Sequence, residues 1–170
     1  MDSEQILENI LNNSNIDTLE NASEFIRGYI KKLVLDIILY VDSNINLGTI
    51  ELVDSYSIEN ELSQEITGLP SAYSAIDGDE KVLTSFAENY SHLGIAEYDS
   101  LCKEALLDFL NLHNGLFIVY LSEENICELS LSVPKQNGNK KLLSPYKGKI
   151  TVIPVNFSFG TAKFLLLELQ

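Results

Sequence analysis

The end of the chain limits the possible folds more than any other feature of the sequence. Residues 149–158 and 162–169 are both apolar, and the short segment Phe159-Gly160-Thr161 separates them. Two apolar runs of strand length, joined by a short turn that contains glycine, predict an antiparallel β-hairpin. We therefore expect a fold built around a β-sheet.

Helical patterns precede this hairpin. Residues 22–41 carry apolar side chains at intervals of three and four, and residues 3–13 and 80–92 show the same spacing over shorter stretches. A further helix is expected to begin at Asp99 or Ser100, because either residue can cap its first turn. Helices placed between pairs of strands predict an α+β fold, in which a mixed or antiparallel β-sheet packs against long α-helices.

Further strands are expected ahead of the hairpin. They cover residues 48–56, 71–76 and 126–133, which are short runs of strand-forming residues. Residues 57–70 are polar, and their sequence indicates no particular structure. Residues 116–121 would form another strand by propensity alone, although they follow a helical pattern directly.

The composition indicates one acidic, soluble domain. The chain has 170 residues, of which 45% are hydrophobic, and its 25 acidic and 11 basic side chains give a net charge of −14. This length predicts a single domain over residues 1–170. So acidic a surface repels phosphate backbones and anionic lipid headgroups, which argues against a nucleic acid or a membrane as partner.

We expect a cytoplasmic location. The opening Met1-Asp2-Ser3-Glu4 is acidic where a signal peptide needs positive charge. The longest apolar run, within residues 33–41, is far shorter than a bilayer span.

The common catalytic and metal-binding motifs are missing from the sequence. It has no phosphate-binding loop, no dinucleotide fingerprint, no zinc-protease motif and no serine-hydrolase elbow. Cys102 and Cys127 lie too far apart for a C-x-x-C site. Cys102 and His113 share the apolar face of a predicted helix with Phe109, so we expect both in the core. The sequence therefore predicts no metal site.

One face of this predicted helix carries side chains suited to chemistry. At about 100° per residue, Glu104, Asp108, Asn111 and Gly115 fall within roughly 60° of one another. An asparagine can accept a hydrogen bond from water and donate one to an anion, so it can orient water without repelling phosphate. A glycine allows another backbone to approach closely. A plain solvent-facing helix would show the same pattern, and that alternative stays open.

This face carries a resemblance to a known family. Asp108-x-x-Asn111-x-x-x-Gly115 resembles the E-x-x-N-x-x-x-G helix of the CheX/CheC/FliY chemotaxis phosphatases, and CheX is the most similar. Residues before 70 fit the family loosely, with residues 1–20 as a divergent N-terminal helical extension. The resemblance implies one helix over about residues 99–121, against the strand propensity near its end. The remaining similarity lies in residues 75–80, 85–87, 121–124, 126–134, 152–155 and 157–160.

The resemblance implies a function. Family members remove phosphate from the aspartyl phosphate of a CheY-type response regulator. Asn111 would then orient the attacking water, and Asp108 would contact the lysine of the regulator's active site. Glu104 and Gly115 would help to bind this partner. The protein would need no cofactor of its own, because Mg²⁺ would be held by the phosphorylated regulator.

One position departs from the family pattern. The family has Glu where this chain has Asp108, whose side chain is one methylene shorter. Glu104, one turn earlier on the same face, could partly substitute. Residues 22–41 contain no second E-x-x-N, since Glu24 is followed three residues later by Arg27, so one site per chain is expected.

Two other interpretations remain open at this point. One is a catalytically inactive CheX-like module that binds a response regulator or self-associates, with Asp108 as a mark of lost activity. The other is a carboxylate metal site formed by Glu104 and Asp108. We also expect a homodimer, because the apolar final strands invite pairing at a sheet edge and CheX resembles a dimer formed through its sheet.

Overall fold

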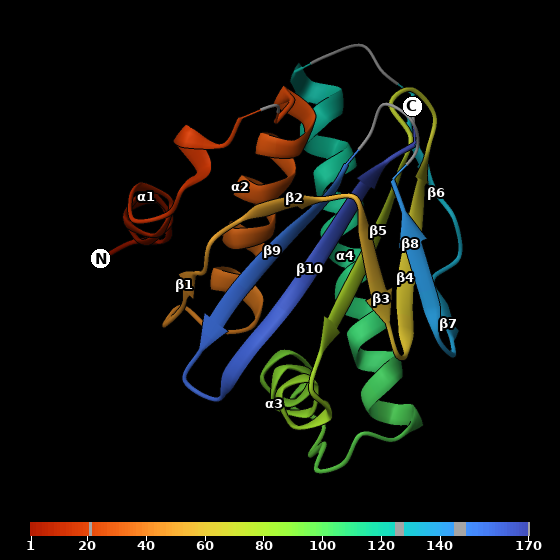
Figure 1. The fold of residues 1–170 in the computed structure, drawn as a ribbon. Helices are drawn as coiled ribbons and strands as arrows, with labels where there is room; N and C mark the ends of the chain where they lie inside the picture. Colours follow the sequence, from red (N-terminus) through yellow and green to blue (C-terminus); the bar gives the residue numbers. More distant parts are fainter. Residues whose placement is uncertain (21, 125–127, 145–148, 170) are drawn as a thin grey trace.

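The computed structural model of the chain describes residues 1–20, 22–124, 128–144 and 149–169, which form four α-helices and one large antiparallel sheet (Figure 1). The α+β architecture expected from the sequence is confirmed. The helical elements are α1 (Ser3–Asn12), the 3-10 turn η1 (Ile16–Thr18), α2 (Glu24–Tyr40), α3 (Glu80–Ser91) and α4 (Ser100–Glu124). The strands are β1 (Asn46–Leu47), β2 (Glu51–Val53), β3 (Ser55–Ile58), β4 (Glu61–Thr67), β5 (Ala72–Gly78), β6 (Ser130–Leu131), β7 (Lys135–Asn137), β8 (Lys140–Leu143), β9 (Ile150–Phe157) and β10 (Gly160–Glu168).

The predicted C-terminal hairpin forms the centre of the sheet. The strand order is β1-β9-β10-β5-β4-β6, with β2 also paired to β9 and β7 to β4. Along the hairpin, Phe157 lies opposite Gly160 at the turn and Ile150 lies opposite Leu167 at the far end. Gly160 has φ +131°, and a Cβ there would come within 2.5 Å of Val82 Cγ2, so this turn position requires glycine.

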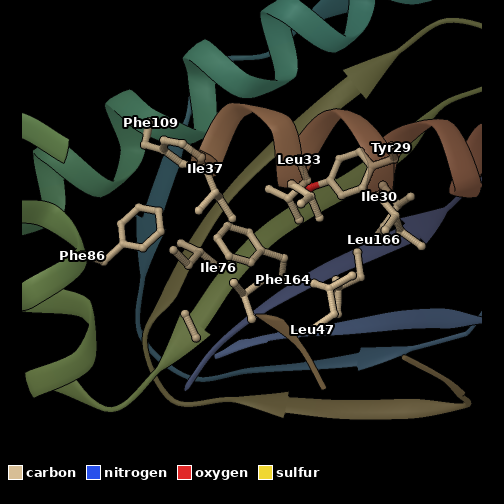
Figure 2. Close-up of a cluster of buried hydrophobic side chains, with 14 of the residues drawn as sticks. Tyr29, Ile30, Leu33, Ile37, Leu47, Ile76, Phe86, Phe109, Phe164 and Leu166 are labelled. Atoms are coloured by element: carbon tan, nitrogen blue, oxygen red, sulfur yellow. The ribbon is translucent and has the colours of Figure 1, made fainter. Parts of the chain in front are cut away.

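Both faces of the sheet are covered, which explains why the hairpin sequence is apolar almost throughout. The helices α2 and α4 lie on one face, and the two-stranded sheet β3–β8 lies on the other (Figure 1). In β10, Phe164 and Leu166 pack towards the helices, whereas Leu165 and Leu167 pack with β3 and β8. Figure 2 shows Phe164 in the larger of these clusters, together with side chains from α2, α3 and α4.

Helix α4 runs without a break through residues 116–121, as the family resemblance implied and against local propensity. Its start is capped by Asp99, whose Oδ1 accepts a hydrogen bond from the Cys102 amide at 3.0 Å. The helical segment 100–123 is long and apolar enough to cross a membrane by length and composition alone. However, half of its most apolar 18-residue stretch is buried inside the protein. The helix therefore has the burial of a core helix, and its apolar residues are explained by packing.

Strand β4 was missed by the sequence analysis. It lies within residues 57–70, where Glu61, Ser63 and Gln64 are polar and yet almost fully buried. Glu61 and Gln64 find hydrogen-bond partners outside the strand, and the Ser63 hydroxyl donates to Glu61, so these polar side chains can be buried and β4 shows no apolar alternation. The expected strand at 48–56 is divided between β2 and β3. Of the strand expected at 126–133, the described part forms only β6, and residues 126–127 lie outside the described residues.

The edge-pairing argument for a dimer is wrong. Strand β9 is paired with β1 and β2 on one side and with β10 on the other, and β10 lies between β9 and β5. The final strands therefore offer no free edge. The homodimer itself remains a prediction that rests on the family resemblance alone.

Residues before α2 fold onto the rest of the protein. Helix α1 packs against α2, and the Arg27 guanidinium donates hydrogen bonds to the carbonyls of Ile16 and Leu19. The Asn15 side chain pairs with the backbone of Ile50 in both directions, each at 2.9 Å.

A buried ionisable pair joins α2 to α4. His113 Nδ1 lies 2.8 Å from Asp36 Oδ2, and both side chains are fully buried. The Lys32 ammonium lies 3.2 Å from the other carboxylate oxygen of Asp36. Burial lowers the pKa of His113 below its usual value, and the interaction with Asp36 does not offset this effect. The expectation that His113 belongs to the core is confirmed.

Candidate functional site

The four predicted residues lie together on the outer face of α4. Glu104, Asp108 and Asn111 are exposed and Gly115 is half-buried, whereas the opposite side of the helix is fully buried. Cys102 lies on that buried side, where burial raises the pKa of its thiol, so its assignment to the core is confirmed. The structure therefore presents an acid, an amide and a glycine along one accessible ridge.

Asp108 is tied to the neighbouring helix α3. The Tyr90 hydroxyl donates a hydrogen bond to Asp108 Oδ2 at 2.7 Å. The Tyr90 ring is itself packed edge-on against Phe109, with 5.4 Å between ring centroids. Burial and then the nearby carboxylate raise the pKa of Tyr90, so its hydroxyl stays protonated and remains a donor at neutral pH. This contact restricts the rotamer of Asp108 and leaves Oδ1 to accept from another donor.

A shallow groove of about 640 Å³ runs beside Asp108. Glu104 and Asp108 both line it, and so do Tyr40, Leu93 and Leu101, whose side chains are all exposed. An apolar groove with two carboxylates suits a partner side chain that has an apolar stem and a cationic head. Glu104 thus has access to the same groove as Asp108.

Asn111 makes a hydrogen bond into the interior. Its Oδ1 accepts from Gln64 Nε2 at 2.7 Å, and Gln64 projects from β4. The same Nε2 donates to the backbone carbonyl of Ser132 at 2.9 Å. Gln64 is only 1% exposed, so the exposed Asn111 side chain is hydrogen-bonded to a buried amide.

The hydrogen bonds continue from Gln64 into the core. Gln64 Oε1 accepts from Asn114 Nδ2 at 2.9 Å, and Asn114 Oδ1 accepts from the Ser74 hydroxyl at 3.2 Å. Ser74 in turn shares a hydrogen bond of 2.6 Å with the Tyr29 hydroxyl. This chain of side chains links Asn111 to α2, through β4, α4 and β5.

Gly115 leaves open space on the ridge. A Cβ at this position would meet only Leu131 Cδ1, at 4.0 Å, which is an ordinary van der Waals distance. No described part of this chain therefore requires glycine here, and the space is available to another molecule.

Gln64 and Tyr90 are the two contacts of the site that sequence reasoning missed. Tyr90 lies within residues 80–92, for which the sequence predicted a helix and no functional role. Gln64 lay in the polar segment 57–70, whose polarity was a signal of buried hydrogen bonding that the sequence alone could not locate. Across the described residues, no group of three or more His, Cys, Asp or Glu side chains could hold a metal ion.

Comparison with known proteins gives a result at the level of structure only. No protein-family model matches the sequence, and no curated protein matches it either. Among solved structures, the chemotaxis protein CheX from Desulfovibrio desulfuricans is 12% identical with a TM-score of 0.68, and the match covers 86% of this chain and 99% of that one. A CheC-like superfamily protein from Shewanella sp. PV-4 is 14% identical with a TM-score of 0.71, covering 85% of this chain and 97% of that one.

A third similar structure includes a second protein. The CheX-CheY-BeF3-Mg²⁺ complex from Borrelia burgdorferi matches with 16% identity and a TM-score of 0.64, over 86% of this chain and 99% of that one. These likenesses show that the chain has a CheX-like fold.

Proposed function

We propose that this protein is a phosphatase that acts on the aspartyl phosphate of a CheY-type response regulator. The observation that carries the proposal is Asn111, presented on an exposed face of α4 in a CheX-like fold and held from behind by Gln64. A similar structure contains CheX together with CheY, BeF3 and Mg²⁺, which supports a regulator of this kind as partner.

Asn111 would act by orienting water. In this reaction the water oxygen forms a bond to phosphorus while the bond between phosphorus and the aspartyl oxygen breaks. The electron pair returns to the aspartate carboxylate; one hydrogen of the water stays on the attacking oxygen, and the other is transferred as a proton to another oxygen of the released phosphate. Because phosphoryl transfer needs positioning and charge stabilisation more than covalent participation, one well-placed amide is sufficient for the role.

Asp108 would receive the regulator's active-site lysine. Its carboxylate keeps Oδ1 for such a donor while Tyr90 holds Oδ2. Glu104 lines the same groove and adds negative charge, which offsets in part the shorter reach of aspartate. An exposed ion pair of this kind contributes only about 0–1 kcal/mol, so its main effect is on orientation.

The remaining expectations belong to this proposal. The Mg²⁺ ion would be held by the regulator, and the protein would act in the cytoplasm as a homodimer.

The test is dephosphorylation of a receiver domain. We expect the protein to accelerate phosphate release from a phosphorylated CheY-type receiver, and Asn111→Ala to return the rate to spontaneous decay. Asn12→Ala is the matched control, because Asn12 is an exposed asparagine on α1. Release at the spontaneous rate with the unaltered protein would refute the proposal.

A second candidate is a non-catalytic module that binds the receiver. It is favoured by Asp108, which is shorter than the family's glutamate and already bonded to Tyr90. This alternative predicts that a receiver activated with beryllofluoride binds the protein while phosphate release stays at the spontaneous rate. Binding measured by calorimetry, beside the release assay, separates the two.

A further inference from the structure

We infer that Gln64 is a positioning residue for Asn111 and that it determines which end of the Asn111 amide faces the partner. The kinetic consequence rests on the proposed function, because the orientation matters for rate only if Asn111 orients water. The orientation itself follows from the hydrogen bonds alone.

The argument starts from a backbone carbonyl. Gln64 Nε2 lies 2.9 Å from the carbonyl oxygen of Ser132, and a carbonyl can only accept. Ser132 is itself fixed to β4, because its backbone amide donates to the Glu65 carbonyl at 2.9 Å and its hydroxyl accepts from the Glu65 amide at 3.0 Å. The NH₂ end of Gln64 must therefore point towards Ser132.

The other end of Gln64 makes a hydrogen bond that agrees with this orientation. Its Oε1 accepts from the buried side chain of Asn114, whose own oxygen is taken by the Ser74 hydroxyl. Reversing the Gln64 amide would place its oxygen against the Ser132 carbonyl, a repulsion that no rotation of a neighbouring group relieves, and would require Asn114 and the Ser74 hydroxyl to reverse as well. One orientation is therefore strongly preferred.

This preference is passed on to Asn111. The second Nε2 hydrogen of Gln64 points to Asn111 at 2.7 Å, so the Asn111 atom that faces it has to be the acceptor Oδ1. The NH₂ of Asn111 then faces away from Gln64. The side-chain amide of an unrestrained surface asparagine would flip between its two orientations, whereas here the partner always meets the two N–H donors of Asn111 and the remaining lone pair of Oδ1. Asn111 can therefore hold a water molecule by donating to the water oxygen and accepting one of the water hydrogens.

Gln64→Met tests the kinetic part, because methionine keeps the length and removes the donor. We expect kcat for phosphate release to fall by about tenfold, since a small misplacement of the oriented water is costly, while KM for the phosphorylated receiver changes less than about twofold. Gln5→Met is the control: it makes the same change at an exposed glutamine on α1, outside this chain of hydrogen bonds. We expect it to keep kcat.

Receiver binding separates positioning from general damage. If Gln64 acts only by positioning Asn111, Gln64→Met should bind a beryllofluoride-activated receiver within about twofold of the unaltered protein while its kcat falls. A full kcat in Gln64→Met, or a loss of receiver affinity as large as the loss of kcat, would overturn the inference.

A structural readout decides the geometry even if Gln64→Met does not fold or if the protein proves not to be a phosphatase. By NMR, the side-chain NH₂ of Gln64 should exchange slowly with solvent, because it is buried and both hydrogens are bonded. Asn111→Asp keeps an acceptor and should preserve this protection, whereas Asn111→Ala should reduce it. Fast exchange in the unaltered protein, or equal protection in the two variants, would overturn the orientation. Failure of the proposed function is recognised separately, by spontaneous-rate phosphate release from the unaltered protein.

Discussion

Replacing Gly115 with alanine separates the stability of α4 from its use as a docking surface. Glycine inside a helix is destabilising by about 0.5–1 kcal/mol relative to alanine, because the unfolded chain gains more freedom from it. The added Cβ would meet only Leu131 Cδ1 at 4.0 Å, so no strain offsets this gain. We expect Gly115→Ala to raise the melting temperature by about 1–3 °C, from the average unfolding entropy of a chain of this size.

The same substitution should weaken partner binding. If the receiver's backbone approaches α4 at this position, the new methyl group fills the required space, and the affinity for a beryllofluoride-activated receiver should fall by about tenfold, the loss expected from an overpacked contact. Thermal unfolding and calorimetric binding measure the two effects on the same sample.

Gly28→Ala on α2 is the matched control. Its Cβ would meet Tyr120 Cε1 at 3.7 Å and Phe117 Cε1 at 3.8 Å, which are ordinary contacts. It should stabilise the helix to a similar extent and leave binding unchanged. A lower melting temperature for Gly115→Ala would refute the packing argument, and stabilisation with unchanged affinity would refute the docking role of Gly115.

Two further predictions concern the buried His113 and the exposed hydrogen bond between Tyr90 and Asp108. Burial lowers the pKa of His113, so as the pH falls below about 6.5 this histidine takes up a proton in the unfolded chain before it does so in the folded protein. The free energy of unfolding should therefore decrease from pH 7 towards pH 5, by up to about 1.4 kcal/mol per pH unit. Thermal unfolding across this range checks the sign, and a stability that rises as the pH falls would contradict it. Tyr90→Phe should free the Asp108 side chain, costing about 0.5–1.5 kcal/mol of stability and lowering receiver affinity a few-fold; the affinity of Asp108→Ala should then be insensitive to Tyr90→Phe.

Several elements were predictable because their signals are local. The hairpin of β9 and β10 follows from two apolar runs around Gly160, and α2 follows from apolar side chains repeated at helical spacing. The exposed face of α4 was also predictable, because residues at spacings of three, four and seven must share one side of a helix. These inferences depend only on backbone geometry.

Other elements were hidden because their causes are distant in the sequence. Strand β4 is polar yet buried, since Glu61 is satisfied by Tyr73, Asn137 and Lys140, which come from three other strands. The pairing of the final strands was misjudged for a similar reason. Strand β1 has only two residues and carries little signal, and the strand signal around β2 did not show that β2 pairs with β9.

The sequence by itself determined that Asp108, Asn111 and Gly115 share one exposed side of a helix, because helical periodicity requires it. Only the tertiary structure decided how these residues are held. Tyr90 reaches Asp108 from α3, and Gln64 reaches Asn111 from β4, across 18 and 47 positions of the chain. Hydrogen bonds between such distant residues depend on how the elements pack, and that packing alone turns an asparagine on a helix surface into one with a defined orientation.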